Sequence, residues 1–342
     1  MVVTYNGRKY VDNCLRTLID SSPDNIDVVV VDNDSADGTA AYVREFFPSI
    51  RVVESGANLG YGEANNKGAL TGTGQYIAVL NQDALVTTGW LTPLIDALEA
   101  HPAVGLVTPK ILQHDTPDRI NTCGNAPHYT GITPCRGFDA PVDAPAYAGS
   151  HQVGAVSGAA FLIRRDLFDA IGGFDGSFFL YLEDTDLSLR ALSAGYESWY
   201  VADSTVLHEF EPRFGTDKLF FLERNRYVML LKLYRWRTLV ALLPALCLTE
   251  VAVWGYALLR GPSAVRSKAR AWWSLLRALP DVLKRRKSVQ LLRQRPDRDI
   301  LSACEATLDL KELGMQTGGF AMAVLNPLFS RWHRVLLAVV RW

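Results

Sequence analysis

The stretch V-V-V-V-D-N-D at residues 28–34 decides the fold of this 342-residue chain. Four consecutive β-branched residues leave no polar side on a strand, which indicates a strand buried on both faces of a parallel sheet. Two aspartates and an asparagine follow where the strand ends. In open α/β sheets, ligands bind beyond the carboxyl ends of the strands. The loop that begins at Asp32 is therefore the first candidate for a binding site.

The residues around this stretch alternate short apolar runs with helical patterns, which predicts a sheet wrapped by helices. We expect strands at 2–5, 51–54 and 76–80, and helices at 11–19, 39–47, 62–71 and 90–100. Residues 113–152 are rich in Pro, Gly, Asp and Thr, and we expect them to run over the surface. Loops of that length are uncommon unless they are functional.

The composition, with 49% hydrophobic and 21% charged residues, excludes a largely disordered chain. The net charge of −1 hides an asymmetry, because residues 1–260 carry 20 basic and 30 acidic side chains, whereas residues 261–300 carry 11 basic and three acidic ones. The two parts therefore face different partners. The five cysteines show no C-x-x-C pair, so we expect free thiols in a reducing compartment.

Two strand-end carboxylates have the chemistry that a nucleotide diphosphate requires. Asp32 can accept hydrogen bonds from a base or ribose, although a neighbour in its loop could simply cap the next helix. Asp83, with Asn81 nearby, can hold a divalent cation that offsets the charge of a diphosphate leaving group, or it can cap a turn. The glycines of N-L-G-Y-G at 58–62 permit close approach of the backbone to an anionic group.

The segment F-L-Y-L-E-D-T-D-L at 179–187 places three carboxylates within four residues of an aromatic-rich stretch. Carboxylates in apolar surroundings have a raised pKa, which suits a general base acting on a sugar hydroxyl. Asp186 and Arg190 stand four residues apart on a predicted helix, so we expect them to form an ion pair.

Eight segments in this order resemble the family-2 glycosyltransferases of the GT-A fold, in the branch of bacterial rhamnosyltransferases. They are V-V-T-Y-N at 2–6, D-N-D-S-A-D-G-T at 32–39, N-L-G-Y-G at 58–62, N-Q-D at 81–83, S-G-A at 157–159, G-G-F-D at 172–175, F-L-Y-L-E-D-T-D-L at 179–187, and His208 before E-R-N-R at 223–226. The resemblance implies an α/β fold, with a Rossmann-like, nucleotide-binding mixed sheet flanked by helices. It implies a catalytic domain at 1–237, followed by a helical membrane-associating or oligomerisation region at 238–342.

The resemblance also implies the roles of particular residues. Nucleotide-sugar-binding positions are Thr4, Tyr5, Asn6, Asp32, Asn33, Asn58, Gly60, Asn66, Asn81 and Asp83. Asp83 and His208 would bind Mg²⁺ or Mn²⁺, although His208 could instead be a packed residue. Asn81 departs from the family motif, which often has Asp there, and this weakens the expected metal site. Asp184 would be the general base, with Ser157, Gly158 and Glu183 in the acceptor site.

The implied reaction is a single displacement that inverts the anomeric carbon. The expected donor is dTDP-rhamnose, and the expected acceptor is a lipid-linked or growing cell-surface glycan. Other UDP- or dTDP-sugars carrying galactofuranose, N-acetylglucosamine or glucose are alternatives within the same class. A catalytically idle scaffold and a nucleotidyltransferase are alternatives from other classes, although the Glu183–Asp184 pair disfavours both.

The C-terminal region contains a run of 22 residues, 238–259, with one charge at Glu250 and one proline at Pro244. A bilayer core needs ~20 apolar residues, but a central Glu would cost roughly 2.5–3.5 kcal/mol on insertion scales. We therefore expect a peripheral or re-entrant helical pair on the cytoplasmic face of a bacterial membrane, with residues 271–273 at headgroup depth and 284–287 on anionic lipid. A soluble helical subdomain or a homo-oligomer contact is the alternative. Nucleic acid is disfavoured, because the basic stretch has long apolar faces and the body is acidic.

Overall fold

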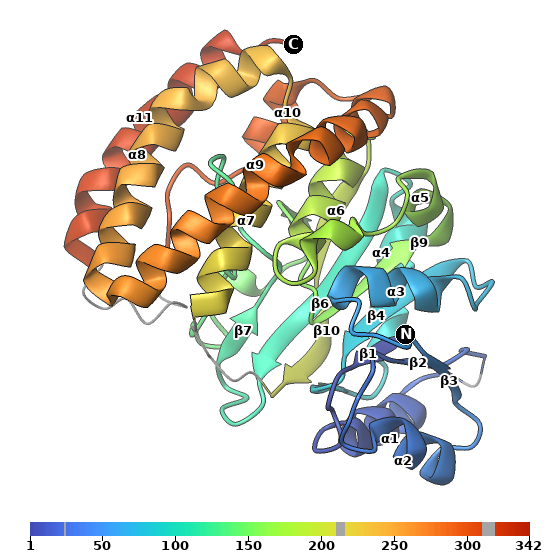
Figure 1. Cartoon of the computed structure of the whole chain (residues 1–342). Helices are drawn as coiled ribbons and strands as arrows, with labels where there is room; N and C mark the ends of the chain where they lie inside the picture. The colour runs from blue at the N-terminus through green and yellow to red at the C-terminus, as the bar shows by residue number, and fades with distance from the viewer. Residues whose placement is uncertain (24, 210–215, 310–318) are drawn as a thin grey trace. The chain divides into compact units, whose positions relative to one another are not determined.

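The computed structural model describes residues 1–23, 25–209, 216–309 and 319–342 (Figure 1). The chain divides into two compact units. The first takes in Met1–Asn125, Cys135–Ala191 and Tyr196–Glu211, and the second takes in Ala126–Pro134, Leu192–Gly195 and Pro212–Trp342. Compactness does not say where a catalytic domain ends, so the predicted boundary at residue 237 stays a prediction. The five cysteines all lie within the described residues, where none is in a disulfide.

The first unit is built on one mixed sheet, to which the described residues contribute ten strands in the order β3-β2-β1-β4-β9-β6-β10-β5, with β7 on β6 and β8 on β10. The strands are β1 Val2–Thr4, β2 Val29–Asp32, β3 Arg51–Glu54, β4 Tyr76–Asn81, β5 Ala84–Val86, β6 Val104–Gln113, β7 Ile120–Thr122, β8 His151–Val153, β9 Ala160–Arg164 and β10 Glu197–His208. The helices are α1 Val11–Ser21, α2 Thr39–Phe46, α3 Tyr61–Ala69, α4 Leu91–Ala100, α5 Arg165–Ala170 and α6 Glu183–Ser193.

Strand β2 is buried on both faces, as the run of valines at 28–31 predicts, and it contains three of those valines followed by Asp32. Val30 belongs to the core cluster that contains Leu15 of α1, whereas Val29 and Val31 pack with Ala64 of α3. Helices α1 and α2 accordingly lie on one side of these strands, and α3 lies on the other (Figure 1). The alternating residues of one strand thus join two helical layers to the sheet.

The parallel strands β1, β2 and β4 end at the same edge of the sheet. Thr4 lies beside Asp32 in the β1–β2 register, and Val3 lies beside Asn81 in the β1–β4 register. The polar loops that follow these strands therefore start side by side. This common edge is where the sequence places the nucleotide site.

Residues 113–152 correct one prediction, because part of this segment is not on the surface. Residues 120–125 are all buried, and β7 pairs with the long strand β6, which the sequence pattern did not predict. Their polar side chains are tolerated inside because they find partners there: Thr122 Oγ1, for example, donates to the carbonyl of Gly124.

The second unit is helical. Its helices are α7 Thr216–Leu233, α8 Trp236–Arg260, α9 Pro262–Leu291, α10 Asp297–Ser302 and α11 Gly319–Val339. Among the described residues, α8 alone is long and apolar enough to cross a membrane by length and composition. Glu250, in the middle of α8, accepts hydrogen bonds from Tyr227 Oη (2.7 Å), Lys268 Nζ (2.8 Å) and Trp272 Nε1 (3.1 Å). The charge that weighed against insertion is therefore paired within this unit.

Candidate active site

The loops after β1 and β2 are held together by their own polar groups. The Asn6 N–H donates to Ser35 Oγ, and Asn6 Oδ1 accepts from the Ala36 N–H, both at 2.9 Å. Asp32 is 3% exposed, and its Oδ2 accepts from the Ser35 N–H at 3.0 Å. Its Oδ1 is buried and accepts no hydrogen bond from the described residues. A buried acceptor of this kind needs a donor, which a ribose hydroxyl or a base would supply.

Gln82 is a residue of this edge that sequence reasoning missed. Its Oε1 accepts from Thr4 Oγ1 (2.7 Å) and from the Tyr5 N–H (3.0 Å). Thr4 is fully buried, whereas Tyr5 is 47% exposed and can offer its ring to a base. The signal was present in the sequence, because Gln82 is the middle residue of N-Q-D, between the two positions that were selected.

Two predicted donor-site asparagines use their side chains to hold loops. Asn33 Nδ2 donates to Asn58 Oδ1 (3.0 Å) and to the carbonyl of Gly60 (3.2 Å). Asn66 Nδ2 donates to the Phe174 carbonyl (2.9 Å), and its Oδ1 accepts from the Phe174 N–H (2.8 Å). These bonds support a structural role for both residues, and their contact with the donor stays a prediction.

The turn that leads into α6 is backbone-strained. Phe179, Tyr181 and Leu182 have φ values of 63°, 69° and 68°, which non-glycine residues rarely adopt. Gly60 has a φ of 78°, and a Cβ at this position would collide with the carbonyl of Phe179. Strain of this kind clusters at functional sites. Here it immediately precedes the first residues of α6.

Those first residues are the carboxylates Glu183 and Asp184. Asp184 Oδ2 accepts from the Gly158 N–H (2.7 Å) and from Asn125 Nδ2 (2.9 Å), and its Oδ1 accepts from the Thr185 N–H (2.6 Å). The predicted acceptor-site residue Gly158 thus contacts the predicted base directly. Asn125 is a second residue that sequence reasoning missed, since it lies in the segment taken for a surface loop.

The surroundings of Glu183 and Asp184 affect the pKa values of the two carboxyl groups differently. Burial raises the pKa of Glu183 to about 8, and the neighbouring Asp184 adds to the shift. The Oε2 atom of Glu183 is buried and, within the described chain, accepts no hydrogen bond. Burial also raises the pKa of Asp184, but the donors around it favour its charged form. At neutral pH Glu183 therefore keeps its proton, and the hydrogen-bond donors around Asp184 make Asp184 the member of the pair better suited to carry a negative charge.

The third carboxylate of the cluster has a structural partner. Asp186 Oδ2 lies 2.7 Å from Arg190 Nε, and both side chains are buried. The predicted ion pair is confirmed. Ser157, beside Gly158, is 7% exposed, and its Oγ accepts from the Ala159 N–H at 3.3 Å.

Asp83 and His208 meet because β5 pairs with β10. Ala84 lies opposite His208 in this register, and Asp83 Oδ1 lies 3.3 Å from His208 Nε2. His208 Nδ1 lies 3.2 Å from Asn121 Oδ1. An imidazole with its proton on Nδ1 would donate to Asn121 and present the lone pair of Nε2 to the carboxylate, which is the form that binds a metal ion.

This arrangement fits a divalent cation. Asp83 Oδ1 is buried, accepts no hydrogen bond from the part of the chain that is described, and lies 3.3 Å from His208 Nε2, so the two atoms are close enough to bind one ion. Across the described residues no group of three or more His, Cys, Asp or Glu side chains gathers at a metal position. Asp83 and His208 would thus be the ligands among the described residues, and phosphate oxygens and water could complete the coordination. Asn81 ends β4, with its N–H donating to the Ala159 carbonyl at 2.9 Å.

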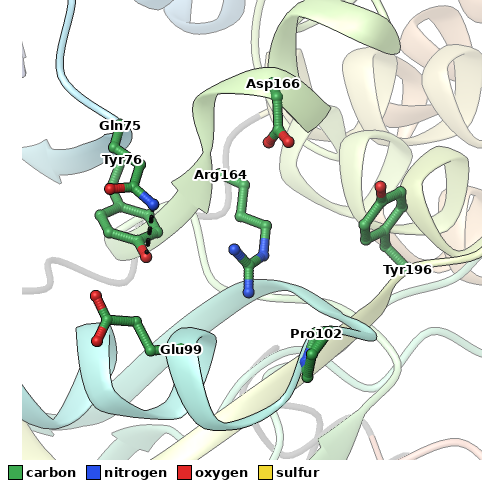
Figure 2. A pocket seen from close by; sticks show the side chains of 7 residues that line it. All are labelled: Gln75, Tyr76, Glu99, Pro102, Arg164, Asp166 and Tyr196. Carbon is green, nitrogen blue, oxygen red and sulfur yellow. Dashed lines mark hydrogen bonds between the residues drawn. The ribbon is translucent and has the colours of Figure 1, made fainter.

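A separate hollow of about 450 Å³ lies at the other ends of the strands (Figure 2). Its lining residues are Gln75, Tyr76, Glu99, Pro102, Arg164, Asp166 and Tyr196. Tyr76 begins β4, whereas the candidate site follows the last residue of that strand. The Arg164 guanidinium donates to the carbonyls of Val104 (2.9 Å) and Leu98. The second bond satisfies a carbonyl in the last turn of α4 and thus caps the C-terminus of this helix. This hollow is therefore distinct from the candidate site, which lies in the loops that follow β1, β2 and β4.

Solved structures with this arrangement define the class of fold. TarS 1-349 from S. aureus, in complex with UDP-GlcNAc, aligns with a TM-score of 0.54 at 14% identity over 99% of this chain and 90% of its own. GalNAc-T7 with UDP, GalNAc and Mn²⁺ aligns with a TM-score of 0.53 at 16% identity, over 67% of this chain and 46% of its own. The mixed sheet with its flanking helices is therefore the GT-A fold, as predicted.

Sequence comparison gives the family. The family model described as "Glycosyl transferase family 2" matches residues 1–172 of this chain. The N-acetylglucosaminyl-diphospho-decaprenol L-rhamnosyltransferase of Mycobacterium tuberculosis is 30% identical over 243 residues, which are 64% of this chain and 77% of that protein. The O-antigen biosynthesis protein RfbC of Myxococcus xanthus is 26% identical over 210 residues, or 57% of this chain and 16% of that protein. The chain belongs to glycosyl transferase family 2.

Proposed function

We propose that this protein is an inverting glycosyltransferase that moves rhamnose from dTDP-rhamnose onto a lipid-linked or growing cell-surface glycan. The observation that carries the proposal is the buried pair Glu183 and Asp184 at the start of α6, in which Asp184 accepts hydrogen bonds from the Gly158 N–H, Asn125 Nδ2 and the Thr185 N–H. Such a pair has no use in simple nucleotide binding. The rhamnosyltransferase relative supports the choice of sugar and of a lipid-linked acceptor.

The strand ends of β1, β2 and β4 would bind the donor. The unpartnered Oδ1 of Asp32 accepts from the nucleoside, and Tyr5 stacks on the base. Asp83 and His208 would hold Mg²⁺ or Mn²⁺ beside the diphosphate. Once bound, the cation would neutralise charge that develops on the leaving group.

Asp184 takes the proton of the acceptor hydroxyl. The acceptor oxygen then forms a bond to the anomeric carbon, while the bond from that carbon to the diphosphate oxygen breaks and its electron pair leaves with the nucleoside diphosphate. Attack from the face opposite the leaving group inverts the anomeric configuration. Thr185 Oγ1 lies 3.2 Å from Asp184 Oδ1, the longest of the contacts to this carboxylate, so it yields most readily to an acceptor hydroxyl.

A donor panel tests this function. The protein is mixed with dTDP-rhamnose, UDP-galactofuranose, UDP-N-acetylglucosamine or UDP-glucose, with Mg²⁺ or Mn²⁺, and thermal shift and nucleoside diphosphate release are measured. We expect the largest shift and release with dTDP-rhamnose, and NMR of the product should show an inverted anomeric centre. Release of pyrophosphate would indicate a nucleotidyltransferase, and failure to bind any donor would indicate a scaffold.

We further propose that the second unit rests on an anionic membrane at its cytoplasmic face. Helix α8 exposes Val240 (65%), Val251 (72%) and Leu259 (90%), and α9 exposes Lys284 and Lys287. A helical unit that exposes both apolar side chains and lysines favours anionic lipid.

The structure changes which residues of α9 can contact lipid. Ala271 is 2% exposed, and Trp272 donates to Glu250, so Trp273, which is 58% exposed, is left for the headgroup region. Arg286 is 8% exposed, and its guanidinium donates to the carbonyl of Tyr234 at 2.5 Å. The basic contact with lipid is therefore smaller than residues 284–287 predicted.

Vesicle co-sedimentation tests the membrane proposal. Val251→Glu should weaken binding to phosphatidylglycerol vesicles, because it puts a negative charge on the exposed face of α8. Leu70→Glu, at an 87% exposed position in the first unit, is the matched control and should bind like the wild type. Equal binding of both variants would contradict the proposal. Resistance of the membrane-bound protein to alkaline carbonate extraction would show that it spans the membrane instead. Light scattering measures the oligomeric state.

A further inference from the structure

The buried segment Asn121–Asn125 contacts both proposed reactive groups of the first unit. Its backbone is fixed, since Thr122 pairs with Ile111 of β6 and the Asn125 N–H donates to the Ala155 carbonyl at 2.8 Å. Asn121 and Asn125 are 3% and 8% exposed. Two amides are thus held inside the protein on a rigid piece of chain, four residues apart.

The amide of Asn125 points at the carboxylate of Asp184. Its Nδ2 donates to Asp184 Oδ2 (2.9 Å) and to the Val156 carbonyl (3.1 Å). Both partners only accept hydrogen bonds, so the nitrogen must lie on this side of the amide. The carbonyl of Val156 fixes the amide, and the amide in turn fixes the carboxylate.

The amide of Asn121 points at His208. Its Oδ1 lies 3.2 Å from Nδ1 of the imidazole, whose Nε2 faces Asp83. Partners behind a metal-binding histidine set its tautomer and its ring orientation. One short segment therefore lies behind the predicted metal position and behind the predicted base.

We propose that the Asn121–Asn125 segment positions both reactive groups, Asn125 by holding the carboxylate of Asp184 and Asn121 by holding the imidazole of His208. This proposal rests on the proposed function. Neither asparagine is a catalytic residue, since each acts through the side chain that it holds. The segment fixes the acceptor side and the leaving-group side of the reaction relative to one another.

A pH profile tests the role of Asn125. Its N–H favours the charged carboxylate, so Asn125→Ala should move the acid limb of kcat/KM to higher pH by about one unit. Asn125→Asp should move it further, because a second carboxylate would face the first. Among the described residues, Glu183 of α6 and Tyr61 of α3 interact electrostatically with Asp184, and Asp186 interacts with Glu183; all three are the same in every variant.

The matched control is Asn326→Ala, which also removes two hydrogen bonds of a side-chain amide, here both to the backbone of Leu308 in the second unit. It should leave the acid limb in place. If Asn125→Ala and Asn125→Asp melt cooperatively but lose activity by the same factor at every pH, the positioning role is wrong. Turnover by Asp184→Asn would instead contradict the proposed function, so the two failures are distinct.

Metal binding tests the role of Asn121 without any turnover. Mn²⁺ is titrated into the protein, and the free ion is measured by electron paramagnetic resonance. Asn121→Ala should weaken Mn²⁺ binding by about tenfold or more, whereas Asn125→Ala should bind Mn²⁺ like the wild type. Equal affinity in the wild type and Asn121→Ala, or no Mn²⁺ binding by the wild type, overturns this half of the proposal.

Discussion

Glu183 in the first unit and Glu223 in the second are equally buried, with 6% and 5% exposure, yet their pKa values move in opposite directions. Burial and the neighbouring Asp184 raise the pKa of Glu183 to about 8. Burial opposes ionisation of Glu223 as well, but Arg226 and Lys268 outweigh it and lower its pKa. The neighbouring charge, rather than depth, therefore decides whether a buried carboxyl group keeps its proton.

The two regions use this difference for different purposes. In the second unit Glu223 and Glu250 join α7, α8 and α9 through Arg226 and Lys268, so their charges are permanent and structural. In the first unit, within the described chain, no cation lies against Glu183, and a proton can be held or passed there. The proposed proton-transfer site thus differs from the ion cluster of the second unit because no described Lys or Arg side chain pairs with its glutamate.

The largest expected effect is on the rate of sugar transfer, when the carboxylate of Asp184 in the first unit is replaced by an amide. Asp184→Asn should lower the rate of sugar transfer by about 10²–10⁴-fold, the usual contribution of a general base. Donor binding should persist, because the strand ends of β1 and β2 are untouched. Product formation and thermal shift with donor are measured on the same preparation. Retained turnover would contradict the role of Asp184.

Removing a cation from the second region should affect stability. Lys268→Met leaves Glu223 and Glu250 with one fewer positive partner in a buried position. Breaking a buried pair in this way costs about 3–5 kcal/mol. Denaturant unfolding checks the change, with the exposed Lys284→Met as the control, which should unfold like the wild type. If both variants unfold alike, the cluster is not structural.

The smallest expected effect at neutral pH is that of Glu183→Gln, because glutamine resembles the protonated carboxyl group. Its loss of activity at pH 7 should be well below that of Asp184→Asn. Between pH 4.5 and about 8 the folded protein holds a proton at Glu183 that the unfolded chain has released. Wild-type stability therefore falls as pH rises through this window.

Glu183→Gln cannot titrate, so this loss should be absent from the variant. Melting temperatures of the wild type and Glu183→Gln, compared at pH 5 and pH 8, measure the difference. The advantage of the variant should be larger at pH 8. An unchanged difference would mean that Glu183 titrates normally and that the contrast with Glu223 does not hold.

Local signals account for what could be predicted. The β-branched run at 28–31 indicated a doubly buried strand, and the strand has Val30 on one core and Val29 and Val31 on another. The spacing of Asp186 and Arg190 indicated an ion pair, which forms. Both depend on residues a few positions apart, whose relation a strand or helix fixes by itself.

The missed features depend on distant residues. Asn125 and Asp184 are 59 residues apart, and the buried position of the segment 120–125 follows from pairing with β6. A segment rich in polar residues resembles a surface loop until its internal partners are known. The same holds for Glu250, whose partners Arg226 and Lys268 lie on two other helices.

The sequence by itself determined the family and the strands β1 to β4, and it indicated the acidic residues to which the proposed chemistry is assigned, because those depend on residue type and short spacing. Only the tertiary structure decided the environment of each carboxyl group, both at Asp32, which ends the strand within V-V-V-V-D-N-D, and at Glu183 and Glu223 further along the chain. Among the described residues, Asp32 has an oxygen that accepts no hydrogen bond, no cation pairs with Glu183, and two cations pair with Glu223. A carboxyl group's protonation follows from the charges and donors within a few ångströms, and chain folding brings most of those from far away.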